Sequence, residues 1–226
     1  MKKLLILLTA LLVLPSVLYA QPANSPKFGD ISDHWARVEI EETYRQGIMQ
    51  GIDNNTFAPD SSLTRAQLAA CLVRVLQLNM DNLRFIKAPS VSNLFKDTQD
   101  GMWYSETVMI AGYNNIFDMK DGMFRPAEPV TRIEAARAIV NAFKAKNLQV
   151  ITTQIWPEYS DIKDLSQDDI NAVTTIFNMG IMKGYNQRFF PGTSLTRAET
   201  AAILNRALKV IKISSTGDNL PTLPIK

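Results

Sequence analysis

Apolar residues recur with helical spacing in paired segments that flank three loops rich in Gly, Asn, Asp and Pro. In the first pair, the pattern predicts an amphipathic helix over residues 34–46, with Asp33 as its N-cap. Gly47 follows this helix and suits the left-handed conformation that often ends a helix. A second apolar segment begins after Thr64. The pattern therefore predicts helix-loop-helix units.

One short motif marks the start of the second helix in every unit. It occurs as "LTRAQLAACL" at 63–72, "VTRIEAARAI" at 130–139 and "LTRAETAAIL" at 195–204. Each copy has Thr followed three residues later by Gln or Glu, which is a capping box: the hydroxyl accepts from the third helical amide, and the Gln or Glu reaches back to the cap amide. The expected capping residues are Thr64, Gln67, Thr131, Glu134, Thr196 and Glu199.

Two further landmarks precede each capping box in the same order. An aromatic-x-Asp sequence opens each unit, and its aspartate is expected to cap the helix or turn the chain into it. A Phe-x-Pro sequence follows in the loop. Ordered landmarks in three copies predict three repeats that fold as one domain. The repeats span residues 28–78, 95–145 and 159–210, and a flexible tail is expected over 211–226.

The capping box does not explain the arginine that follows each threonine, at Arg65, Arg132 and Arg197. A cation in the first helical turn costs about 0.3–1 kcal/mol because it faces the positive end of the helix dipole. Each guanidinium could pair with a nearby Asp or lie along a neighbouring helix. Alternatively, the helix amides and the forked guanidinium could form a corner that binds a ligand carboxylate. The residues alone leave both explanations open.

The unit "FGDISDHWARVEIEETYRQGIMQGIDNNTFAPDSSLTRAQLAACLVRVL" resembles the S-layer homology (SLH) family. The family pattern runs from an F-x-D opening through Trp-Ala, Gly-Ile-x-x-Gly and F-x-P to a T-R-A-E box. Repeat one matches nearly throughout, whereas repeat three has "DLSQDD" where the tryptophan is expected. Repeat two has Asn115 and Met119 at the two glycine places, so its groove is the doubtful one and at most two working grooves are expected.

The resemblance implies three helix-loop-helix repeats around a pseudo-threefold axis, with a central helical bundle and loop prongs. It also implies a non-catalytic module that binds cell-wall polysaccharide or peptidoglycan in grooves between repeats, with pyruvylated sugars as the ligand. In the family, the T-R-A-E arginine contacts the pyruvyl carboxylate, which here indicates Arg65, Arg132 and Arg197. Trp35 and Trp103 would stack on a sugar or anchor the core. Close sugar approach, or simple turn formation, would explain Gly47, Gly51, Gly180 and Gly184.

Composition narrows the compartment and the chemistry. Residues 1–20 have the layout of a secretory signal, so the chain is expected to be exported to the cell wall, cell surface or periplasm. Without Lys2 and Lys3 of the signal, the 24 basic residues fall to 22 and match the 22 acidic ones, which argues against a nucleic-acid partner. After the signal, no segment is apolar and long enough to span a membrane. One His and one Cys leave no metal or nucleophile cluster, so no metal, cofactor or enzyme activity is expected.

A second interpretation is an exported helical-repeat scaffold for self-assembly or protein–protein contacts. Apolar loop residues, such as Phe117, Met119 and Met123, would suit contact with an envelope protein. The sequence leaves the oligomeric state open.

Overall fold

The computed structural model describes residues 28–119, 121–148 and 155–216, and the expected signal over 1–20 lies outside them. Within these ranges the fold is all-α, with short isolated bridges between loops and no β-strand. No helix in the described part is long and apolar enough to cross a membrane. The elements are η1 (Gly29–Ile31), α1 (Arg37–Arg45), α2 (Arg65–Leu76), α3 (Val91–Leu94), α4 (Ser105–Tyr113), α5 (Arg132–Ala145), α6 (Gln167–Asn178) and α7 (Arg197–Thr216).

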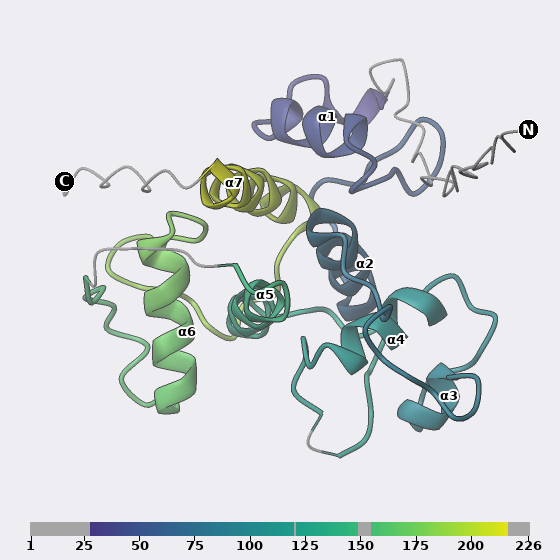
Figure 1. Cartoon of the computed structure of the whole chain (residues 1–226). Coiled ribbons are helices and arrows are strands. Elements are labelled where there is room, and N and C mark those ends of the chain that lie inside the picture. Colours follow the sequence, from purple (N-terminus) through teal and green to yellow (C-terminus); the bar gives the residue numbers. More distant parts are fainter. Residues whose placement is uncertain (1–27, 120, 149–154, 217–226) are drawn as a thin grey trace, which may run out of the picture.

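The second helices of the repeats, α2, α5 and α7, lie at the centre, and the first helices, α1, α4 and α6, lie outside them (Figure 1). Each central helix packs against the outer helix of the following repeat: α2 on α4, α5 on α6, and α7 on α1. The chain therefore closes into a ring in which the last repeat contacts the first.

Three backbone hydrogen bonds join the residues that precede the capping threonines. Val130 N donates to Leu63 O, Leu195 N donates to Val130 O, and Leu63 N donates to Leu195 O, at 2.8–3.0 Å. Because these bonds run in one cyclic direction, they are consistent with the predicted pseudo-threefold arrangement. All three capping boxes form at the starts of α2, α5 and α7, where the threonine hydroxyl and the Gln or Glu side chain each accept a backbone amide.

The outer helices all end in the same way. Gly47, Asn115 and Gly180 adopt left-handed φ values of 69°, 54° and 69°. The amides of each of these residues and of the next one bond back to carbonyls of the last turn, which is the Schellman arrangement. Asn115 fits because asparagine tolerates the left-handed region better than most residues. The missing first glycine of repeat two therefore leaves the turn intact.

Two expected boundaries are wrong. Helix α1 begins at Arg37, three residues later than expected, and Asp33 does not cap it; the amide of Ala36 instead donates to Nδ1 of His34. Helix α7 continues to Thr216, so residues 211–216 of the expected tail are helical, while 217–226 lie outside the described residues. The extra turn forms because Ile211 packs against the core.

Candidate ligand-binding grooves between repeats

The aspartates of the aromatic-x-Asp sequences hold the Phe-x-Pro loops. The expectation that they cap the helices or turn the chain into them is therefore wrong. Asp161 accepts the successive amides of Phe189 and Phe190, both at 2.8 Å. Burial alone would raise the pKa of Asp161, but these amide bonds outweigh it and hold the pKa below its ordinary value. Asp30 and Asp97 bind the matching amides of repeats one and two.

The motif arginines interlock the repeats. Each guanidinium donates from Nε to the carbonyl of the Phe-x-Pro phenylalanine in the next repeat and lies over that ring. Neither explanation from the sequence included this backbone contact, which offsets the cost of a cation beside the helix dipole. The Nε to O bonds are Arg65 to Phe124 (2.7 Å), Arg132 to Phe189 (2.8 Å) and Arg197 to Phe57 (2.8 Å).

A cavity of about 390 Å³ lies beside Arg197. We call this cavity the Arg197 groove. It brings together expected ligand residues from all three repeats: Arg197 from repeat three, Gly51 from repeat one and Trp103 from repeat two. Trp103 is 62% exposed, so its ring is available at the rim and does not anchor the core. Gln50, Gln67 and Arg74 add to the polar lining, and Arg74 was not expected from the sequence.

The Arg197 groove is positively charged. Its described lining contains Arg74 and Arg197 and no acidic residue. Arg197 is only 5% exposed, and it donates hydrogen bonds to the carbonyls of Phe57 and Gln50. Burial lowers the pKa of Arg197, although an arginine stays protonated. A buried cation bonded to neutral acceptors favours an anionic ligand.

Cys71 also lines this groove but contributes no charge. Burial raises the pKa of its thiol to about 11, so it is neutral at physiological pH.

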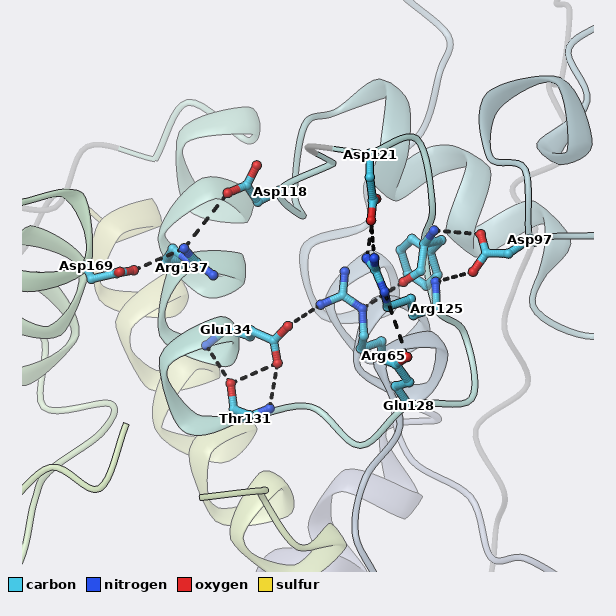
Figure 2. Close-up of polar contacts among 11 residues, drawn as sticks. Arg65, Asp97, Asp118, Asp121, Arg125, Glu128, Thr131, Glu134, Arg137 and Asp169 are labelled. Carbon is cyan, nitrogen blue, oxygen red and sulfur yellow. Dashed lines mark hydrogen bonds and ion pairs between the residues drawn. The ribbon is translucent and has the colours of Figure 1, made fainter. Parts of the chain in front are cut away.

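The groove beside Arg65 has a cavity of about 320 Å³, and carboxylates pair with its arginines (Figure 2). Nη1 of Arg65 donates to Oε1 of Glu134 at 2.5 Å, while Oε2 of Glu134 caps α5 at Thr131. Arg137, which also lines this groove, pairs with Asp118 at 3.9 Å and with Asp169 of α6 at 3.1 Å (Figure 2). The expectation that repeat two has the weak groove stays a prediction, and these ion pairs support it.

The surroundings of Arg132 are intermediate in charge between those of Arg65 and Arg197. Arg132 donates from Nη2 to the carbonyl of Lys183 at 3.0 Å, and Oε1 of Glu199 lies 4.0 Å from its Nη1. Burial lowers the pKa of Arg132 as it does for Arg197. Trp35, the repeat-one counterpart of Trp103, is exposed as Trp103 is.

The second glycine of the motif is required by packing inside its own repeat. A Cβ on Gly51 would lie 2.5 Å from the ring of Phe28, and one on Gly184 would lie 2.5 Å from the ring of Tyr159. These contacts explain both glycines without a ligand, although Gly51 also lines the Arg197 groove.

Comparison with known proteins agrees with this architecture. The S-layer homology domain matches residues 27–69, 94–136 and 158–201, which together are more than half of the chain. The chain therefore belongs to the S-layer homology family.

Similar proteins include an amylopullulanase of Thermoanaerobacterium thermosulfurigenes, 31% identical over 82% of this chain and 10% of that protein. The S-layer protein sap of Bacillus anthracis is 25% identical over 83% of this chain and 22% of that protein. A cellulosome-anchoring protein of Acetivibrio thermocellus is 26% identical over 71% of this chain and 35% of that protein. The chain thus spans a minor part of each of these relatives.

Proposed function

We propose that this chain is a non-catalytic cell-surface anchoring module that binds a carboxylate-bearing wall polymer, such as a pyruvylated polysaccharide, in the Arg197 groove. Family membership and the similarity to an S-layer protein and a cellulosome-anchoring protein support the anchoring role. The observation that carries the choice of ligand is the pairing of Arg74 and Arg197 in a cavity whose described lining has no acid. Export and a cell-wall location belong to the same proposal.

The groove combines the two kinds of contact that an acidic sugar needs. The guanidinium groups favour a carboxylate electrostatically, and arginine suits carboxylates because its donors match their geometry. The exposed face of Trp103 offers an apolar surface to a sugar ring. Gly51 lines the groove with its backbone. Each contact is modest, so a second site on the same molecule, at Arg132, would strengthen binding through effective concentration.

The scaffold interpretation has less support. Phe117 is buried, and Cζ of the Arg65 guanidinium lies over its ring, 5.1 Å from the ring centroid. The Phe117 side chain is therefore not available to a protein partner. A partner protein in the envelope remains compatible with wall binding.

Co-sedimentation with purified cell-wall sacculi tests the proposal. We expect the wild-type protein to pellet and Trp103→Ala to weaken binding about tenfold, because the stacking surface is lost. Trp156→Ala is the matched control, since Trp156 is 60% exposed but lies outside the groove lining. Sacculi stripped of acidic accessory polymer should not retain the protein. Equal pelleting of wild type and Trp103→Ala, or full retention on stripped sacculi, would contradict the proposal.

A further inference from the structure

Three large apolar side chains lie exposed close together in the connection between α2 and α3. They are Leu83, Phe85 and Ile86, and Ile86 is fully exposed at 109%. Elsewhere in the described chain, the large exposed apolar residues occur singly or in pairs. Single apolar residues on a surface need no explanation, but a cluster of them indicates a contact with an apolar partner.

Two cations, Arg84 and Lys87, are interleaved with these apolar residues. All residues from 81 to 88 are exposed, and their two bases and one acid, Asp81, give a net charge of +1. Within the described ranges, neither cation takes part in an ion pair. We call residues 83–87 the linker tip. Its surplus of positive charge favours a negatively charged partner.

The fold holds the linker tip at both ends. Before the tip, Nδ2 of Asn114 at the end of α4 donates to the carbonyl of Asn79 at 3.1 Å. After the tip, the carboxylate of Asp100 accepts the Ser90 hydroxyl at 2.7 Å and the Val91 amide at 3.0 Å. A loop that is fixed at both ends has less conformational freedom to lose when it binds.

The linker tip projects from the surface and does not line a cavity. The ring of Phe85 packs edge-on against the ring of Tyr113, with 5.0 Å between the centroids, while Ile86 stays fully exposed. None of the tip residues lines the Arg197 groove or the cavity beside Arg65. The tip therefore needs a partner that can receive protruding side chains.

The small size of the tip favours a lipid surface over a folded protein. A standard protein–protein interface takes about 20–30 residues from each side and requires a complementary shape. The tip offers residues 83–87 alone. The surface of a bilayer has no fixed shape to match, and it accepts apolar side chains below the headgroups and cations at the phosphates.

The order of residues in the tip suits this layered surface. Leu83, Phe85 and Ile86 can enter the boundary between headgroups and acyl chains, while the long stems of Arg84 and Lys87 let their charges reach the phosphates. Tyr113, behind Phe85, is the kind of amphipathic ring that occurs at headgroup depth.

We propose that the linker tip inserts into the surface of a bilayer that contains anionic phospholipid, so that the module lies on a membrane without spanning it. The inference goes beyond wall binding, because the tip shares no residue with the Arg197 groove. A wall polymer and a membrane could then be held by the same molecule.

Co-sedimentation with lipid vesicles tests the insertion. The chain is used without residues 1–20, since the apolar segment of the expected signal would bind lipid by itself, and all described residues remain. We expect binding to vesicles of phosphatidylglycerol and phosphatidylcholine in equal parts, and at least about tenfold weaker binding to phosphatidylcholine alone. Added salt should weaken binding to the anionic vesicles.

Paired substitutions separate the apolar and the charged contributions. Leu83→Ser with Ile86→Ser, and Arg84→Gln with Lys87→Gln, should each weaken binding to anionic vesicles about tenfold or more. The matched controls lie outside the tip and should change binding less than about twofold. They are Val38→Ser with Ile52→Ser, which are exposed apolar residues, and Lys209→Gln with Lys212→Gln, which are exposed lysines of α7.

A fluorescent label distinguishes insertion from adsorption by charge. Because Cys71 is buried, Ile86→Cys can be labelled selectively with an environment-sensitive fluorophore. We expect the emission to shift to the blue on anionic vesicles and to be quenched by brominated acyl chains. The same label at Val38→Cys, on α1, should respond to neither.

Several outcomes would overturn the inference. These are equal binding to the two kinds of vesicle, wild-type binding by the Leu83→Ser and Ile86→Ser variant, or a label at position 86 that does not respond. Cross-linking of position 86 to a protein, without binding to vesicles, would overturn it in favour of a protein contact. Trp103→Ala should bind vesicles as wild type does, so failure of the wall proposal is scored separately.

Discussion

At the scale of single residues, the Gln or Glu of the capping box decides whether the neighbouring motif arginine has a carboxylate beside it. Oε2 of Glu134 caps its helix while Oε1 reaches Arg65, so one side chain completes the cap and neutralises the arginine. Gln67 forms the same cap without a charge, because its Oε1 accepts the Thr64 amide at 3.0 Å. The capping motif is thus conserved in form between repeats while the electrostatics of the neighbouring groove change.

Gln67→Glu is therefore predicted to close the Arg197 groove without harming the fold. The new carboxylate would keep the cap, as Glu134 and Glu199 do, and would compete with the ligand for Arg197. We expect affinity for sacculi to fall about tenfold and thermal stability to stay unchanged or rise slightly. Co-sedimentation and thermal denaturation measure the two effects. Undiminished wall binding in a folded Gln67→Glu protein would show that Arg197 does not hold an acid.

At the scale of elements, the helix ends set the loops that carry the grooves. The left-handed residue after each outer helix turns the chain toward the Phe-x-Pro loop, and the aspartate of the same repeat then holds that loop by two amides. In repeat two the turn depends on an asparagine where the other repeats have glycine.

Asn115→Ala is predicted to destabilise the protein by about 1 kcal/mol, because a Cβ-bearing residue without a local polar side chain is strained at φ 54°. Asn115→Gly should be neutral or slightly stabilising for the same reason. Asn171→Ala, at an exposed helical position, is the matched control and should change stability by less than about 0.5 kcal/mol. Urea unfolding monitored by circular dichroism gives the comparison. Equal stability of the Ala and Gly variants at 115 would argue against strain at this turn.

At the scale of the whole molecule, the arginine contacts and the cyclic hydrogen bonds join the three repeats. Each motif arginine belongs to one repeat and binds the loop of the next, and the last repeat returns to the first. Because no repeat is held only by its own contacts, the described core is expected to unfold as one cooperative unit.

Arg65→Met is predicted to destabilise the whole ring by about 2–4 kcal/mol. Arg65 is 6% exposed, and its removal leaves the Phe124 carbonyl and the Glu134 carboxylate without their cation. Arg37→Met removes an exposed pair with Glu41 and should cost less than about 0.5 kcal/mol. Tryptophan fluorescence follows the transition, since Trp35 and Trp103 report on different repeats. Separate transitions for the repeats would contradict the interlocked ring.

Local patterns determined much of this protein from the sequence alone. The three capping boxes, the left-handed glycines and the helical class follow from interactions within a few residues, so short motifs such as Thr64-x-x-Gln67 predict them directly. Boundaries were less accurate where a distant contact intervened: Ile211 packs on the core and prolongs α7.

Only the tertiary structure decided what the repeated arginine does in each copy. Arg65 and Arg197 occupy identical places in the motif, yet one pairs with Glu134 and the other faces a groove whose described lining has no acid. Their acceptors lie in the following repeat, 59 and 140 residues away along the chain. Side chains that meet across such separations form charge networks that no local pattern specifies, because the net charge of a groove depends on every element that borders it.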